Sequence, residues 1–170
     1  MKDSKTIAMQ KMLDSKEKRY YKIKRFVEEN KKPVLSFMLN IPGSEKNFED
    51  AVNFHKKYIE EIKKVLEENK IEILWEEYNN LDTGMEYIAL IDGDRKFIKR
   101  EMMKLEEGNE SGRLLDIDIY DENFRQISRA NLNLPERKCI ICEDVARNCI
   151  KEERHSLREL EEKVRNILRK

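Results

Sequence analysis

Residues 112–120 contain two aspartates separated by a single residue, and their side chains could take part in catalysis. Apolar and acidic residues alternate there, which is typical of a β-strand with one buried and one polar face. Asp116 and Asp118 would share the polar face, about 6.5–7 Å apart. Two such carboxylates can hold Mg²⁺, with substrate phosphates completing its ligands, and Arg113 beside them suits a polyphosphate. The alternative is an acidic strand face that only meets solvent.

A second group of residues could hold a different metal. Cys139, Cys142, Cys149 and His155 follow the spacing C-x2-C-x6-C-x5-H, which supplies four ligands for tetrahedral zinc. A capping box begins at Ser156, so the histidine should lie just before the last helix. The alternative is that free cysteines pack as small apolar groups. Both interpretations are open at this point.

The composition bounds the class of protein. Acidic and basic residues balance, 35 against 35, so no global field favours nucleic acid or an anionic membrane. No apolar run has the length of a membrane span, and the N-terminus lacks the apolar core of a signal peptide. We expect a cytoplasmic protein with one domain of 170 residues. Its expected parts are a helical arm (1–32), an α+β core (33–130) and a Cys/His segment with the last helix (131–170).

Periodicity predicts the order of elements that must position these residues. The N-terminal arm should be helical in two pieces, the second starting at a capping box over 14–17. Strands are expected over 34–41, 71–78, 85–91 and 112–120, with helices over 48–66, 97–105 and 157–168. This β-α-β-β-α-β order is the split βαβ pattern of ferredoxin-like α+β sandwiches.

Two details complete the expected sheet. A further strand over 124–129 should form a hairpin with the aspartate strand. The helices should cover one sheet face and leave the other, with the aspartate pair, open. His55 lies on an apolar helical stripe, which favours a packed histidine over a catalytic one.

Several short motifs follow one another along the chain. Each alone is weak evidence for a protein family, but their order as a set is specific. They are Pro33-x-x-Ser36-Phe37, Pro42-Gly43 with Lys46, Thr83-Gly84-x-Glu86, Gly112-Arg113-Leu114-x-Asp116-Ile117-Asp118-Ile119, Ser128-Arg129, Leu134-Pro135-x-Arg137-Lys138-Cys139-x-x-Cys142, Cys149 and His155-x-Leu157. Over residues 12–168 the chain thereby resembles the citrate lyase holo-acyl-carrier-protein synthase family.

The resemblance implies an enzyme of the nucleotidyltransferase type. The family moves a phosphoribosyl-dephospho-coenzyme A group from its triphosphate donor to a serine of the citrate lyase acyl carrier (gamma) subunit, and pyrophosphate leaves. Asp116 and Asp118 would bind Mg²⁺, and Arg113 would act in catalysis beside them. Zinc at the Cys/His group would be structural.

Phosphoryl-type transfer also needs groups that neutralise the leaving group and position the donor. The candidate substrate-binding residues are Arg129, Arg137, Lys138, Lys46, Lys99, Glu86 and Arg19. Lys46 and Lys99 are isolated in the sequence, so ordinary surface cations are the favoured alternative for those two.

A zinc-stabilised module whose open sheet binds RNA or a protein is the competing interpretation. It requires aromatic side chains among cations on the open face, and the strands offer only Tyr120 and Tyr78. We therefore favour the enzyme, with the carrier subunit and triphosphoribosyl-dephospho-coenzyme A as partners and with neither nucleic acid nor a membrane.

Overall fold

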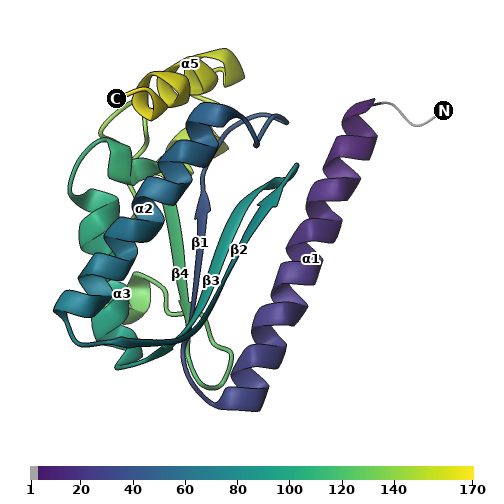
Figure 1. Cartoon of the computed structure of the whole chain (residues 1–170). Coiled ribbons are helices and arrows are strands. Elements are labelled where there is room, and N and C mark those ends of the chain that lie inside the picture. The colour runs from purple at the N-terminus through teal and green to yellow at the C-terminus, as the bar shows by residue number, and fades with distance from the viewer. Residues whose placement is uncertain (1–3) are drawn as a thin grey trace.

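The computed structural model describes residues 4–170 as a mixed α/β protein, with a four-stranded antiparallel sheet and five α-helices (Figure 1). The strands are β1 (Val34–Leu39), β2 (Glu72–Leu81), β3 (Gly84–Asp92) and β4 (Leu115–Tyr120). The helices are α1 (Ser4–Asn30), α2 (Glu49–Glu68), α3 (Arg95–Glu107), α4 (Ala146–Lys151) and α5 (Leu157–Leu168). Two 3-10 turns, η1 (Ser111–Leu114) and η2 (Ala130–Leu132), lie on either side of β4 along the chain.

The sheet has the strand order β2-β3-β1-β4, and each neighbouring pair is antiparallel. Helix α2 connects β1 to β2, and α3 connects β3 to β4. From β1 to β4 the chain therefore follows the predicted β-α-β-β-α-β order. Its placement in the ferredoxin-like class stays a prediction.

The main core lies between one face of the sheet and helices α2, α3 and α5 (Figure 1). Apolar residues of the strands, such as Leu35 and Ile117, are fully buried there against α2 and α3. His55 of α2 is also buried, stacked on Phe37 with ring centroids 4.3 Å apart. Its burial lowers the pKa to about 4. The prediction of a packed histidine is confirmed.

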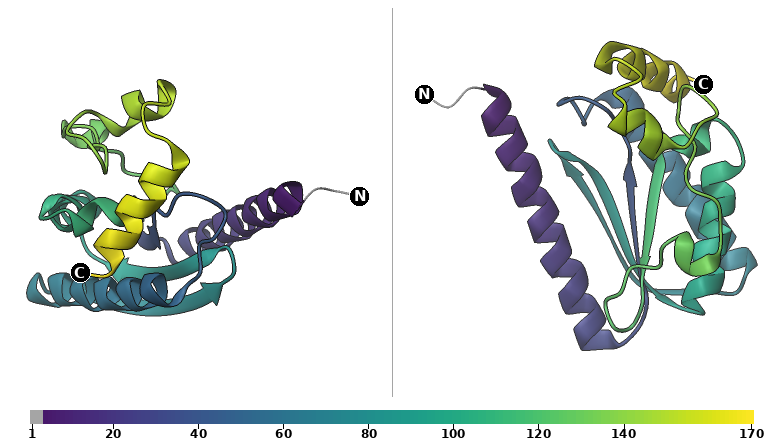
Figure 2. Two further views of the ribbon diagram at one scale, coloured as in Figure 1. Left: turned by 90° about the horizontal axis from the view of Figure 1, so that it is seen from above. Right: turned by 180° about the vertical axis from the view of Figure 1, so that it is seen from behind.

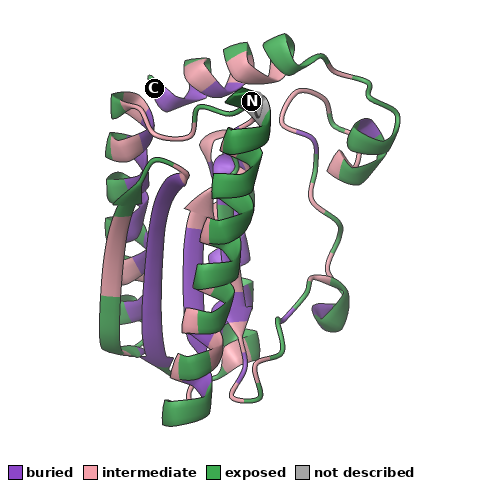
Figure 3. Ribbon diagram, turned by 90° about the vertical axis from the view of Figure 1, so that its right-hand side faces the viewer, coloured by how far each residue is buried: buried purple, intermediate pink, exposed green. Residues whose placement is uncertain are grey.

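Helix α1 lies against the other face of the sheet (Figure 3). Ile23 and Val27 of α1 are buried in a second apolar cluster with strand residues Val34, Ile88 and Leu90. The prediction that this face is open was therefore wrong, because a helical arm with an apolar stripe covers part of it.

The predicted break within α1 was also wrong, since the helix is continuous from Ser4 to Asn30. Asp14 lies inside it and accepts a hydrogen bond from the Gln10 side chain at 2.8 Å instead of capping a new helix. Residues 4–30 contain no glycine or proline, so nothing interrupts the helix.

The predicted hairpin strand over 124–129 is replaced by a tight turn and a single bridge, Tyr120 to Gln126. The buried Asp121 carboxylate accepts hydrogen bonds from the N–H groups two and four residues later, at 2.9 and 2.8 Å. Phe124 adopts a left-handed conformation at φ 60°. This Asx-type turn takes up the residues that would have paired, and the chain then runs back beside β4 toward α5 (Figure 2).

Local signals at the ends of other elements were interpreted correctly. Asp94 caps α3 by accepting from the N–H of Phe97 at 2.7 Å, and the capping box at Ser156 opens α5. Gly112 allows its backbone to lie close to the backbone of α3, because a Cβ there would lie 2.2 Å from the Leu105 carbonyl oxygen. This contact packs η1 on the end of α3, immediately before β4. No helix within residues 4–170 is long and apolar enough to cross a membrane.

Candidate active site

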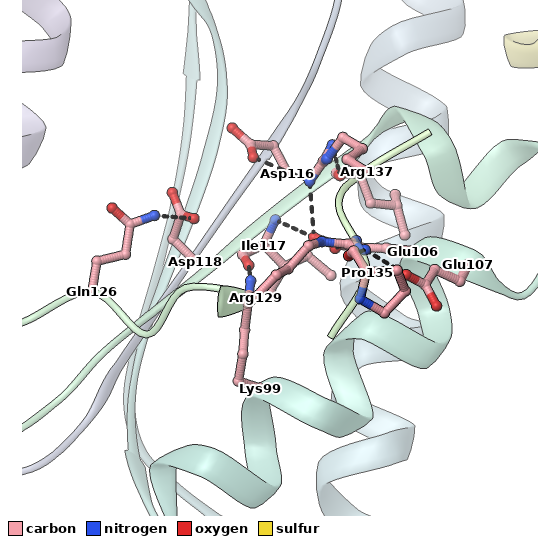
Figure 4. A network of polar contacts seen from close by, with 11 residues as sticks. Lys99, Glu106, Glu107, Asp116, Ile117, Asp118, Gln126, Arg129, Pro135 and Arg137 are labelled. Atoms are coloured by element: carbon pink, nitrogen blue, oxygen red, sulfur yellow. Dashed lines mark hydrogen bonds and ion pairs between the residues drawn. The ribbon is translucent and has the colours of Figure 1, made fainter. Parts of the chain in front are cut away.

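The alternation predicted for β4 is confirmed. Leu115, Ile117 and Ile119 are fully buried, whereas Asp116 and Asp118 project from the opposite face (Figure 4). The Asp116 side chain is 50% exposed. Because β4 is an edge strand of the sheet, one side of the aspartate pair is free of further strands.

Arg137 lies beside this strand face. One of its guanidinium nitrogens is 3.5 Å from an Asp116 oxygen and 3.2 Å from an oxygen of Glu106. The other donates to the Leu115 carbonyl at 2.9 Å. The guanidinium is therefore fixed between an exposed carboxylate on β4 and a buried one on α3.

Glu106 is the centre of this network (Figure 4). Its side chain is 2% exposed, and it accepts a hydrogen bond from the Ile117 N–H at 3.1 Å. Arg129 donates to it at 2.6 Å, in addition to Arg137. A buried carboxylate is costly unless such donors satisfy it. The network thus holds two cations against the free edge of β4.

From the sequence alone, Glu106 could either contribute to the acidic site or only face solvent, and it is not among the candidate substrate-binding residues. Its partners are 11, 23 and 31 residues further along the chain, so no local pattern reveals them. One signal was available: Glu106 follows Ile98 and Met102 at helical spacing, on the buried stripe of α3. An acidic residue in an apolar stripe indicates a buried partner.

Four of the predicted cations line one cavity of about 270 Å³. They are Arg113, Arg129, Arg137 and Lys138, with the carboxylates of Glu106, Glu107 and Glu136 also in the lining. The Arg113 guanidinium donates to the Cys139 carbonyl and to Glu143, both at 2.9 Å, and Lys138 pairs with the same Glu143 at 2.9 Å. The sequence motifs are therefore brought together on one concave surface.

Asp118 faces a neighbouring cavity of about 370 Å³, which Lys99, Gln126, Arg129 and Arg137 also line. Its carboxylate accepts from the Gln126 amide at 2.6 Å. Burial raises the pKa of Asp118 to about 6, and the charge of Asp116 acts in the same direction.

Lys99 is not the surface cation that its isolation suggested. It is only 5% exposed, and its ammonium donates to the Ile117 carbonyl at 2.5 Å. Both backbone polar groups of Ile117, the residue between the two aspartates, are therefore bound: the carbonyl by Lys99 and the N–H by Glu106.

The remaining predicted residues lie on the α1 side of Asp116. Arg19 and Lys46 line a cavity of about 200 Å³ that also contains Asp116. Arg19 pairs with the buried Glu86 at 2.6 Å. The ammonium of Lys46 donates to the Ile41 carbonyl, and its burial lowers the pKa of Lys46. The predicted site residues thus form two sets on either side of Asp116.

Cys139, Cys142, Cys149 and His155 form a group that could hold a metal ion, because their ligand atoms lie within 4.8 Å of one another. Within residues 4–170, no other group of three or more His, Cys, Asp or Glu side chains does so. The sulfurs of Cys142 and Cys149 are 3.4 Å apart. Hydrogen bonds from the Asp144 backbone and from His155 lower the pKa of Cys142 to about 6, which favours the thiolate that binds metals.

Short local contacts build this group. The Cys139 N–H donates to the Asp144 carbonyl at 2.8 Å, and a bridge joins Lys138 to Val145, so the first two cysteines lie on a small knuckle. Cys149 comes from α4, and His155 directly precedes the cap of α5. The Nε2 atom of His155 is buried without a hydrogen-bond partner, as a nitrogen available for another ligand would be.

Fold and site together describe a mixed α/β chain whose edge strand carries paired carboxylates beside a cation-lined cavity. A family model described as apo-citrate lyase phosphoribosyl-dephospho-CoA transferase matches residues 7–170. The chain therefore belongs to that family, and the resemblance seen in the motifs is confirmed.

Individual relatives agree with this assignment. The chain is 28% identical over 168 residues to a probable apo-citrate lyase phosphoribosyl-dephospho-CoA transferase of Vibrio cholerae serotype O1, covering 95% of this chain and 92% of that protein. It is 32% identical over 136 residues to protein CitXG of Leuconostoc mesenteroides subsp. cremoris. That match covers 79% of this chain but only 29% of the Leuconostoc protein. The family description names a transferase that acts on apo-citrate lyase.

Proposed function

We propose that this protein transfers a phosphoribosyl-dephospho-coenzyme A group from its triphosphate donor to a serine of the citrate lyase acyl carrier subunit. The observation that carries the proposal is the contact between Asp116 and Arg137, which joins the paired aspartates to the cavity lined by four cations. Clustered guanidinium groups suit a triphosphate, because each can bind phosphate oxygens through two parallel hydrogen bonds. Family membership supports the donor and the acceptor.

In the proposed reaction the serine oxygen attacks the α-phosphorus of the donor. A phosphodiester bond forms, the bond from that phosphorus to the β-phosphate oxygen breaks, and pyrophosphate leaves with the electron pair. Arg129 and Arg137, which line both the cation-lined cavity and the one that Asp118 faces, would stabilise the charge that develops on the pyrophosphate. The serine proton passes to a carboxylate of the aspartate pair.

The donor set at the strand face fits Mg²⁺, because Asp116 and Asp118 offer hard oxygen ligands on the same side of β4. These two residues would hold the ion, which supplies charge neutralisation on the donor phosphates when bound. Since no third carboxylate joins the pair within the described residues, phosphates and water would complete the ligands.

The Cys₃His group fits a structural zinc ion, which prefers four tetrahedral sulfur and nitrogen ligands. The ion would hold the knuckle against α4 and the start of α5. It would thereby keep the Cys139 carbonyl in place to orient Arg113. The four residues supply all four ligands of a tetrahedral site and leave no position open for a substrate, so we assign no catalytic role to this metal.

The element order and the strand order β2-β3-β1-β4 also support a ferredoxin-like class for the sheet. The binding-module alternative has less support. The Tyr78 hydroxyl is buried and its ring lies beside His55, 5.8 Å away by centroids, while Tyr120 stacks on Phe124 at 5.4 Å. Neither ring is a free platform for a nucleic acid base.

The direct test is the intact mass of the apo acyl carrier subunit after incubation with this protein, Mg²⁺ and triphosphoribosyl-dephospho-coenzyme A. We expect the mass to rise by one phosphoribosyl-dephospho-coenzyme A unit. The matched control is a carrier whose acceptor serine is replaced by alanine, and this carrier should stay unmodified. An unchanged mass of the unaltered carrier, with a verified donor and folded proteins, would contradict the proposal.

A further inference from the structure

A second, larger cavity adjoins the cation-lined one and has no part in the chemistry proposed above. Its volume is about 550 Å³, and it lies between the end of β1, the cysteine knuckle, α4 and α5. Most of its wall is apolar, formed by Pro42, Ile140, Ile150, Leu157, Leu160 and Val164. Sites for small organic ligands have such walls and volumes of about 300–1,000 Å³.

Two of these apolar side chains are exposed to solvent. Ile150 is 77% exposed and Leu157 is 54% exposed, although both line the same cavity. Exposed apolar groups that gather around one concavity often mark a ligand site. Single exposed apolar residues elsewhere on the surface carry no such meaning.

The two cavities share three cationic residues. Arg113, Arg137 and Lys138 line both the 270 Å³ cavity and the 550 Å³ cavity. A molecule whose phosphates contact these three side chains can therefore extend an uncharged part directly into the apolar cavity. In the proposed donor, the group that fits this arrangement is the diphosphate of the dephospho-coenzyme A unit. This diphosphate is joined directly to a long, mostly aliphatic arm and is separate from the triphosphate on the second ribose.

We propose that the apolar cavity binds the pantetheine arm of the dephospho-coenzyme A group. This inference rests on the proposed function, since it places one part of the proposed donor. The arm has a dimethyl carbon and methylene groups, which suit the aliphatic walls, and two amides. Asn40 in the lining supplies a polar side chain for those amides.

The cavity also gives the cysteine group a role in substrate binding. Cys139, Cys149 and His155 belong to the cavity lining as well as to the metal-binding group. A metal held there would fix the relative positions of the knuckle, α4 and α5, which form three sides of the cavity. The arm site would then depend on the metal through its walls and not through direct ligation.

The test is a comparison of two ligands by calorimetry on the full-length protein with Mg²⁺. Dephospho-coenzyme A and ADP-ribose both contain an ADP diester of the same charge, but only the first has the arm. We expect dephospho-coenzyme A to bind about tenfold more tightly, which burial of its two methyl groups would explain. Equal affinities for the unaltered protein would overturn the inference.

Substitutions then locate the arm. Leu157→Trp should fill the cavity mouth and reduce the preference to less than about threefold, with the affinity for ADP-ribose unchanged. Ile150→Asp should have the same effect by placing a charge in the wall. The matched control is Leu74→Trp, which alters a side chain that is 42% exposed on β2, the strand at the far edge of the sheet from β4. A full preference in both cavity variants would contradict the inference.

The mass assay separates this inference from the proposed function. If the carrier gains the expected mass while the two ligands bind equally, the transfer stands and the arm site is wrong. If the ligand preference and its loss in Leu157→Trp are observed without any transfer, the cavity binds the arm and the reaction is wrong.

Discussion

The carboxylate of Glu106 accepts a hydrogen bond from the N–H of Ile117 at 3.1 Å, and Ile117 is the residue between the two aspartates of β4. The same carboxylate pairs with Arg129 at 2.6 Å and with Arg137 at 3.2 Å. One buried group thus contacts both the strand that carries the aspartates and two cations of the adjoining cavity. We infer that Glu106 positions these groups relative to one another.

Replacing Glu106 by glutamine should test this role, because the side-chain volume is kept while the charge is lost. Arg129 and Arg137 would lose their buried partner, so we expect the free energy of unfolding to fall by at least about 2 kcal/mol. The KM for the donor should rise as the two guanidinium groups lose their fixed positions. Urea unfolding and steady-state transfer kinetics measure the two effects.

The control for that variant is Glu107→Gln. Glu107 is the next residue along α3 and also pairs with Arg129, but its side chain is 49% exposed. Its loss should change stability by less than about 1 kcal/mol. Equal effects of the two substitutions would show that Glu106 acts only as an ordinary surface charge.

Removing either carboxylate of the aspartate pair should abolish transfer without unfolding the protein. Asp116→Asn and Asp118→Asn keep the shape of the side chains but remove the charge that would hold Mg²⁺. The mass assay measures transfer, and circular dichroism verifies the fold. Asp82→Asn, in the exposed turn between β2 and β3, is the control and should retain activity. Near-normal turnover of both β4 variants would rule out the two-aspartate mechanism.

The features that the sequence predicted correctly depend on local patterns. The alternation in β4 shows which face holds Asp116, because a strand has a fixed period of two residues. The cap at Asp94 and the capping box at Ser156 are contacts within three residues. Close spacing in the chain also predicted the Cys/His group, whose ligands all fall within residues 139–155.

The features that were missed or left open depend on distant partners or on competing local contacts. The sequence left the role of Glu106 open, because that role depends on Arg129 and Arg137, which the fold brings to it. The strand expected over 124–129 had a suitable composition, but the Asp121 carboxylate binds two N–H groups of the turn instead. Coverage of the second sheet face by α1 could not be predicted, because periodicity alone does not say where a helix packs.

The Cys/His group should contain zinc and depend on it for stability. We expect about one zinc ion per chain by elemental mass spectrometry. Removing it with a chelator should lower the melting temperature by at least about 5 °C, since a structural ion stabilises only the folded state. Cys142→Ser provides the control, because this variant should bind little zinc and its melting temperature should not respond to the chelator. An unchanged melting temperature of metal-free protein would contradict a structural role.

Asp118 should make stability depend on pH in a defined direction. Its pKa is raised from 3.8 to about 6, chiefly by burial, so folding favours the protonated carboxyl. This contribution to stability is fully present below about pH 4 and is lost as the pH rises through about 6. Asp118→Asn resembles the protonated form at every pH. Without metal, the variant should therefore be more stable than the unaltered protein near pH 7.5, and its advantage should shrink as the pH falls toward 4. Urea unfolding across this range measures the difference, and a constant difference would show that the Asp118 carboxylate is not destabilised in the folded protein.

Added Mg²⁺ should reduce the stability advantage of Asp118→Asn at pH 7.5, because only the unaltered protein retains both proposed ligands.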